Sequence, residues 1–151
     1  MMKSLMAAAA LVSLGACTSM EDKLGLNIPT FTTKLAPGAG ITSPGSGDGI
    51  FTLDTATLVL GYTVNYKDLT GPATMAHIHG PAEAGANAGV IVPLTVASPT
   101  QIAGTVTLTE AQIAELKAGK CYVNIHTAAN KGGEIRGQIM QFMMPEVRIE
   151  R

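Results

Sequence analysis

Charged and aromatic side chains are both scarce in this sequence of 151 residues. Only 14% of the residues are charged and 4% are aromatic, and tryptophan is absent. The ten lysines and arginines are scattered and are balanced by eleven acids, which excludes the concentrated positive charge expected of a nucleic-acid-binding protein. A mean hydropathy of +0.28 with so little charge also argues against a disordered chain. Length and composition therefore predict a single folded domain.

The N-terminal apolar stretch Leu5–Leu14 spans about ten residues, which is too short to cross a bilayer as a helix. It follows the basic residue Lys3 and is typical of a secretion signal. The stretch ends in Leu14-Gly-Ala-Cys17, which resembles the lipobox of bacterial lipoproteins, where the cysteine becomes lipidated. We predict a lipoprotein signal peptide over residues 1–16 with lipidation at Cys17. The alternative is an ordinary signal peptide that leaves Cys17 as a free thiol.

Lipidation would place the protein in the cell envelope, because acyl chains hold a protein at a membrane surface without a spanning helix. Thr18 rather than an aspartate follows the cysteine, which resembles outer-membrane retention in Gram-negative bacteria. We therefore expect an outer-membrane anchor, with the protein facing the periplasm or the cell surface. Residues 17–28 then form a tether, residues 29–144 the folded domain, and residues 145–151 a charged tail.

Cysteine is too scarce for a disulfide framework if Cys17 carries lipid, because Cys121 is then the one cysteine left. We predict that Cys121 is a small buried apolar residue.

Short runs of alternating and β-branched residues recur along the domain and predict strands. Turn-forming residues separate them, and the densest such run, Ala36–Gly49, predicts one long loop. Helical spacing occurs once, where Thr109 and Gln112 form a capping box and the pattern ends at Gly119. The sequence predicts an all-β sandwich or Greek-key barrel with one short helix that covers an open end. The predicted strands are Pro29–Lys34, Ile50–Leu53, Thr57–Tyr66, Ala73–His79, Val90–Leu94, Gly104–Leu108, Cys121–Thr127 and Glu134–Gln141.

All three histidines lie in predicted strands, where successive side chains point to opposite faces. His77 and His79 alternate with apolar residues and so share one face, about 6 to 7 Å apart along the backbone. His126 and Asn124 occupy the polar face of the strand Cys121–Thr127. If the two strands are neighbours, the three imidazoles can bind one metal ion.

Imidazole suits copper, zinc, iron and nickel, and an exported chain without a thiolate cluster favours copper first and zinc second. The alternative is a structural role, in which the histidines form hydrogen bonds with loop carbonyls.

Glu134 and Arg136 follow a tight hairpin at Asn130–Gly133 and are expected side by side on the outward face of the last strand. They either form an ion pair of small energetic consequence or leave Arg136 to bind an anionic ligand. With Asn124, they make a second group of candidate site residues. Three methionines near the end of the chain are interpreted either as thioether copper ligands or as filler at the core edge, namely Met140, Met143 and Met144.

These motifs, in this order, resemble the CHRD domain, which was first described in chordin and occurs widely in secreted bacterial proteins. The resemblance covers most of residues 30 to 141 and implies an all-β, immunoglobulin-like architecture with no enzymatic activity established for the class. The segments that carry it are Leu69–Ala82, Gly89–Leu94, Leu108–Gln112, Tyr122–Thr127, Asn130 and Gly133–Gln138.

A weaker similarity is to the β-barrel of Cu,Zn superoxide dismutase, which also has His-x-His on one strand and a later histidine before a glycine-rich hairpin. The similarity implies that His77, His79 and His126 correspond to three copper ligands. The chain has no further histidine for a metal bridge, no zinc cluster and no cysteine pair, which argues against dismutase activity.

We therefore expect an exported lipoprotein that binds a metal, copper foremost, with a metal donor or acceptor or an envelope protein as its partner. The alternative is a non-catalytic adhesion module that binds a protein or a glycan. An enzyme is the least favoured class, because no catalytic triad, acidic pair or nucleotide-binding motif is visible.

Overall fold

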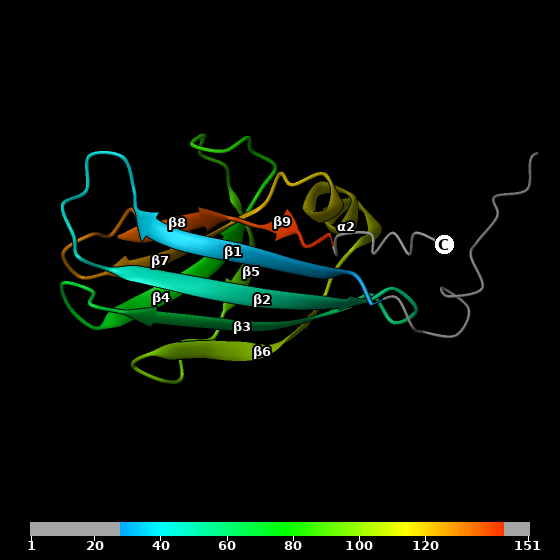
Figure 1. Cartoon of the computed structure of the whole chain (residues 1–151), viewed down its shortest axis with the longest axis horizontal. Coiled ribbons are helices and arrows are strands. Elements are labelled where there is room, and N and C mark those ends of the chain that lie inside the picture. The colour runs from blue at the N-terminus through cyan, green and yellow to red at the C-terminus, as the bar shows by residue number, and fades with distance from the viewer. Residues whose placement is uncertain (1–27, 144–151) are drawn as a thin grey trace, which may run out of the picture.

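The computed structural model describes residues 28–143, so the predicted signal peptide, Cys17 and the charged tail lie outside the described residues. This part of the chain consists of nine strands and one helix, which confirms the predicted all-β fold with a short helix (Figure 1). No helix within it is long and apolar enough to span a membrane. The elements are β1 Thr30–Pro37, β2 Ser46–Asp54, β3 Val59–Lys67, β4 Ala73–His79, β5 Val90–Leu94, β6 Gln101–Thr107, α2 Glu110–Lys117, β7 Tyr122–Thr127, β8 Ile135–Gln138 and β9 Met140–Gln141.

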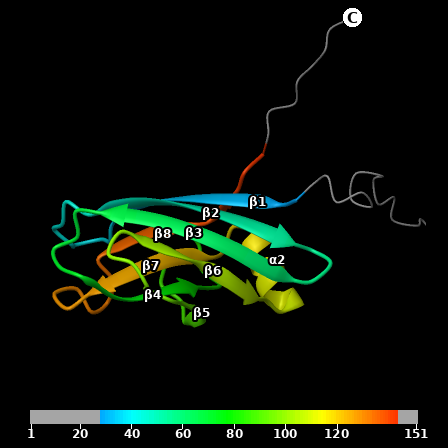
Figure 2. The same cartoon turned by 90° about the horizontal axis from the view of Figure 1, so that it is seen from below.

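The strands form one antiparallel path in the order β5-β4-β7-β8-β1-β2-β3-β6, with β9 paired to β1. This path folds over into two facing layers (Figure 2). β1 belongs to both layers, because Leu35 and the residues before it pair with β2, whereas Ala36 and Pro37 pair with β8. The architecture is therefore a nearly closed sandwich in which β4, β7 and β8 lie next to one another.

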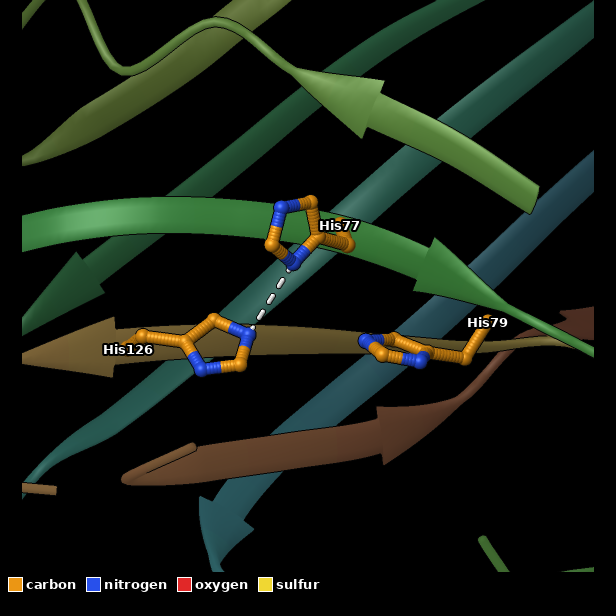
Figure 3. Close-up of side chains that lie close together, drawn as sticks. All are labelled: His77, His79 and His126. Carbon is orange, nitrogen blue, oxygen red and sulfur yellow. Dashed lines mark hydrogen bonds between the residues drawn. The ribbon is translucent and has the colours of Figure 1, made fainter. Parts of the chain in front are cut away.

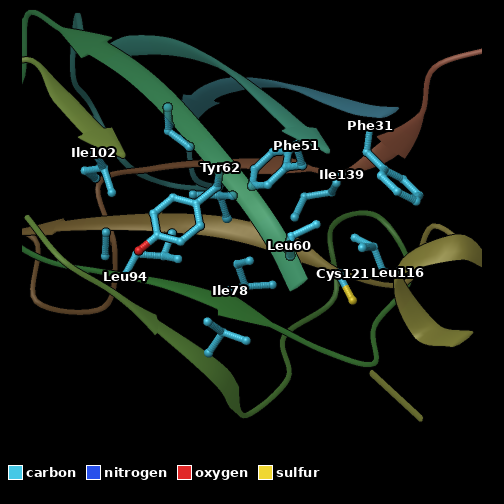
Figure 4. Packing of buried hydrophobic residues seen from close by; sticks show 14 of the residues in the cluster. Phe31, Phe51, Leu60, Tyr62, Ile78, Leu94, Ile102, Leu116, Cys121 and Ile139 are labelled. Atoms are coloured by element: carbon cyan, nitrogen blue, oxygen red, sulfur yellow. The ribbon is translucent and has the colours of Figure 1, made fainter. Parts of the chain in front are cut away.

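Aliphatic side chains, with few aromatics, fill the space between the layers (Figure 4). Phe31 and Phe51 are fully buried in this core. The N-cap Thr109 closes the predicted capping box, and α2 adds Leu116 to one end of the core. Cys121 is buried as expected, and burial, with a smaller effect of the Glu115 charge, raises the pKa of its thiol to about 12.

The long loop predicted over Ala36–Gly49 is shorter than expected, because β1 extends to Pro37 and β2 begins at Ser46. The segment from Ser46 to Gly49 has few apolar side chains, yet its backbone pairs with both β1 and β3. Gly47 suits this position, since an added Cβ would approach the Asn65 carbonyl oxygen too closely. This part of β2 is held by backbone hydrogen bonds. Its side chains therefore show no alternating hydrophobic pattern from which a strand could be predicted.

Other strand boundaries also differ from the prediction. The first strand runs three residues further than predicted, and β6 begins at Gln101 rather than at Gly104. The predicted last strand divides at Ile139, whose N–H donates to the Cys121 carbonyl, after which β9 pairs with β1. β4 and β5 match their predicted bounds, so the strand that carries two histidines is confirmed.

Candidate metal site

The three histidines come together on one face of the β4–β7 pair (Figure 3). Ala76 and Ile78 point into the core, so His77 and His79 lie on the opposite face, as the alternation predicts. His126 comes from β7, the antiparallel neighbour of β4. The ring centroid of His77 lies 4.9 Å from that of His126 and 5.6 Å from that of His79. One nitrogen from each ring lies within 4.8 Å of the other two.

Backbone carbonyls fix the tautomers of two of these rings. His79 donates from Nδ1 to the Ala88 carbonyl at 3.0 Å, and His126 donates from Nδ1 to the Lys131 carbonyl at 2.9 Å. A carbonyl oxygen only accepts, so Nδ1 carries the proton in both rings and Nε2 keeps a lone pair. His77 Nδ1 lies 3.1 Å from His126 Nε2 and therefore donates to it. The Nε2 lone pairs of His79 and His126 thus face the space between the rings, and the His77 Nδ1–H group points at the lone pair of His126.

His79 Nε2 is the least satisfied atom of the group. It is buried and makes no hydrogen bond within residues 28–143, and it is directed toward the other two rings (Figure 3). Leaving a buried acceptor unpaired costs about 1–3 kcal/mol. A purely structural role gives no reason for an unpaired buried nitrogen. A metal ligand, in contrast, requires a free lone pair.

The pKa directions favour neutral rings for His77 and His79. Burial lowers the pKa of His77, and the neighbouring His126 and His79 lower it further. Burial also lowers the pKa of His79, although the hydrogen bond to Ala88 acts in the opposite direction. Neutral imidazole is the form that binds metal ions.

The spacing of the three nitrogens is close to that of a shared ion. Three ligand nitrogens at about 2 Å from one ion lie about 3.4 Å from one another. The His77–His126 nitrogen pair, at 3.1 Å, already satisfies this spacing. The three nitrogens lie within 4.8 Å of one another, so the widest separation must shorten by about 1.4 Å to reach that value.

An aromatic and a cationic group support His79 from the side. The Tyr122 ring stacks on His79 with centroids 4.9 Å apart and planes 5° from parallel. The guanidinium carbon of Arg136 lies 3.8 Å from the centre of the same Tyr122 ring. Arg136 also donates to Asn87 Oδ1 and to the Ala86 carbonyl, which ties the loop over residues 80–89 to the sheet.

Most of the polar face is covered, which corrects the expectation of an outward face, and His77 is only partly buried. His79, His126 and Asn124 are each less than 10% exposed. Two loops, residues 80–89 and 128–134, fold back over the face and supply the carbonyls that hold the rings. Asn124 is part of this covering and donates to the Gly132 carbonyl rather than projecting into the site. Strand alternation predicts the face of a side chain but carries no information on what covers it.

The predicted pairing of Glu134 with Arg136 is wrong. Glu134 is fully buried just before β8, where its carboxylate accepts hydrogen bonds from Ser43, Thr70, Thr127 and Asn130. Burial raises the pKa of Glu134, but the hydrogen bonds outweigh it and bring the value to about 2. The sequence shows that Glu134 follows the hairpin at Asn130–Gly133, but it does not show which residues contact the carboxylate. The four hydrogen-bond donors therefore could not be predicted.

Arg136 is likewise occupied within the protein, by the loop and by Tyr122. The anionic-ligand interpretation of Arg136 therefore gains no support from the geometry. Tyr122 was placed on the correct face by alternation, but its contact with His79 depends on strand register, which one sequence does not give.

The terminal methionines divide between the described and undescribed parts of the chain. Met140 lies in β9 near Gly119, at the helix end, and Met143 is 82% exposed. Met144 lies outside the described residues.

Comparison with known proteins agrees with the motifs described above. The family model of the CHRD domain matches residues 31–139, which include the three histidines and both covering loops. No curated protein and no solved structure matches the chain significantly.

Proposed function

The chain belongs to the CHRD domain family, and we propose that it is an exported, lipid-anchored protein of the cell envelope that binds one metal ion. The proposed ligands are His77 Nδ1, His79 Nε2 and His126 Nε2, and the proposed metal is copper, with zinc as the alternative. The observation that carries this proposal is the buried, unpartnered Nε2 of His79, directed toward two further imidazole nitrogens.

The hydrogen bonds of the other ring nitrogens support the same assignment. Metal-binding histidines usually donate their other ring N–H to a carbonyl or carboxylate, which fixes the tautomer and the ring orientation. His79 and His126 have this arrangement through Ala88 and Lys131. On metal binding, His77 moves its proton from Nδ1 to Nε2, which releases Nδ1 as the third ligand. An all-imidazole group suits copper or zinc better than magnesium or calcium, which prefer oxygen ligands.

Calorimetric titration with Cu(I), Cu(II) and Zn(II) tests this proposal. A Cys17→Ser background removes one of the two cysteines, whose thiol would itself bind Cu(I), and the other, Cys121, is buried. We expect one ion per chain, with affinity reduced at least a hundredfold in His77→Ala and in His126→Ala. His77 is only partly buried, so its alanine variant is expected to fold, and circular dichroism checks this.

Lys67→Ala is the matched control, because Lys67 is exposed at the end of β3 and takes no part in the cluster. Equal metal binding in the parent and His77→Ala proteins would contradict the proposal. No binding to the parent protein would favour the structural role and the adhesion function instead.

The anchor is proposed on separate grounds, namely the short apolar stretch and the small residues before Cys17. In bacteria that express the full chain, we expect incorporation of labelled palmitate and partition into the detergent phase. Cys17→Ser should abolish both, whereas Cys121→Ser should leave labelling intact. If neither the parent protein nor Cys121→Ser incorporates the label, the chain is an ordinary secreted protein.

A further inference from the structure

A half-exposed methionine lies beside the histidine cluster. Met75 is 49% exposed, so its side chain is accessible from solvent. It precedes His77 by two residues on β4, and the intervening Ala76 is buried in the core. Strand alternation therefore places Met75, His77 and His79 on the same face.

The strand register places Met75 directly opposite one of the proposed ligands. Met75 pairs with His126 across the β4–β7 ladder, and the register continues without a break to the pair of His79 and Tyr122. Side chains that are directly opposite in an antiparallel pair have Cβ atoms about 4.5–5.5 Å apart. Met75 and His77 therefore both flank His126 on the side of the site where exposure is greatest.

The Met75 side chain is suited to provide a further ligand on the exposed side of the histidine cluster. It has three rotatable bonds, which let the sulfur atom move toward a nearby group without a change in the backbone. A thioether is a soft ligand that selects Cu(I), whereas zinc is bound mainly by thiolate, imidazole and carboxylate. Three imidazoles alone do not discriminate strongly between copper and zinc.

We propose that Met75 provides a thioether as the fourth ligand, so that the site has three nitrogens and one sulfur and prefers Cu(I) to Zn(II). This inference rests on the proposed metal-binding function and goes beyond it by assigning the metal preference to one side chain. The half-exposed Met75 also places the fourth ligand at the surface, where a copper donor or acceptor can displace it. The other three ligands remain held by the sheet and its loops.

Met140 provides a matched control. It is 54% exposed, similar to Met75, but it lies in β9 and pairs with Thr32 of β1. A thioether at this position belongs to a different part of the sandwich from the histidines. Met75→Leu and Met140→Leu each replace sulfur by a carbon side chain of similar size at an exposed site, so both variants are expected to fold.

The test compares Cu(I) and Zn(II) affinities of the parent, Met75→Leu and Met140→Leu proteins, all in the Cys17→Ser background. Competition with a coloured chelator under anaerobic conditions gives the Cu(I) affinity. We expect Met75→Leu to weaken Cu(I) binding about tenfold or more and to change Zn(II) binding less than threefold. Met140→Leu should change neither. X-ray absorption of the Cu(I)-loaded parent should show one sulfur neighbour, which Met75→Leu removes and Met140→Leu retains.

The results separate this inference from the function on which it rests. Cu(I) binding that is lost in His77→Ala but unchanged in Met75→Leu, with no sulfur neighbour, overturns the role of Met75 and leaves the histidine site intact. Equal weakening of Cu(I) and Zn(II) in Met75→Leu also overturns the proposed preference, because it indicates a purely structural effect. No Cu(I) binding to the parent protein overturns both proposals.

Discussion

Glu134 joins two distant loops to the β7–β8 connection through one buried carboxylate. Its oxygens accept hydrogen bonds from the loop after β1, the loop before β4, the end of β7 and the following hairpin. Removing the acceptor would leave the buried Thr127 hydroxyl without this partner and would break the contacts with the partly buried Ser43 and Asn130. Glu134 therefore positions the loop that carries the Lys131 carbonyl, although it does not touch the histidines.

Replacement of this carboxylate is expected to destabilise the fold. Glu134→Gln keeps the shape of the side chain but places an N–H₂ group among donors, so we expect a loss of about 2–4 kcal/mol in the free energy of unfolding at pH 7. Urea denaturation measures this loss. Glu83→Gln, at an exposed position, is the control and should change stability by less than about 0.5 kcal/mol.

The low pKa of Glu134 also predicts a pH dependence. The pKa is about 2 in the folded protein against an ordinary 4.5, so the ionised form stabilises the fold fully above about pH 4.5. This stabilisation, about 3 kcal/mol in full, is lost as the pH falls from about 4.5 toward 2. The stability gap between the parent and Glu134→Gln proteins should therefore narrow steadily over this range. A gap that stays constant with pH would contradict the assignment.

Two residues of β8 attach the loop over residues 80–89: Arg136 binds Ala86 and Asn87, and Gln138 donates to the Ala82 carbonyl. Arg136→Gln removes the bonds to Ala86 and Asn87 and the contact with Tyr122, which stacks on His79. We expect metal affinity to fall about tenfold, because groups that orient ligands typically contribute this much. The chelator competition described above measures it, with Lys67→Gln as control. An unchanged affinity would mean that the loop holds Ala88 in place without Arg136.

The crossing of β1 from one layer to the other depends on Gly137. A Cβ at this position would collide with the Lys34 carbonyl oxygen, so Gly137→Ala must separate β8 from β1. We expect a loss of about 3 kcal/mol or more in unfolding free energy. Gly132→Ala is the control, because an added Cβ there meets no neighbour. Thermal denaturation compares the two variants. Equal stability would show that β1 and β8 tolerate a wider separation.

The sequence predicts those elements whose side chains alternate between core and surface. β4 and β5 have such alternation and turn residues at both ends, and their bounds agree with the structure. Ser46–Gly49 lacks it, since its pairing depends on the backbone alone, and so it was predicted as loop. Alternation also placed the three histidines on one face. The burial of that face depends on contacts between loops far apart in sequence, and these leave no periodic pattern.

For the molecule as a whole, metal binding should appear as added stability. The covering loops and the sheet are brought together at the histidines, so an ion that binds the folded form favours it over the unfolded chain. At a free metal concentration about a hundred times the dissociation constant, the gain is about 2.7 kcal/mol. For a domain of this size we expect the melting temperature to rise by about 10 °C.

Differential scanning calorimetry with and without Cu(I) measures this rise under anaerobic conditions. A chelator should reverse it, and His126→Ala should show none of it. An equal rise in His126→Ala would place the stabilising ion elsewhere on the protein.

The most direct measurement is a crystal structure of the copper-loaded Cys17→Ser protein with anomalous scattering at the copper edge. We expect one strong peak at full occupancy, within about 2.2 Å of His77 Nδ1, His79 Nε2 and His126 Nε2. The Ala88 and Lys131 carbonyls should still accept from His79 and His126, as they do in the structure described. A peak held by only one of these histidines, or by none, would contradict the proposal that the three form a single metal site.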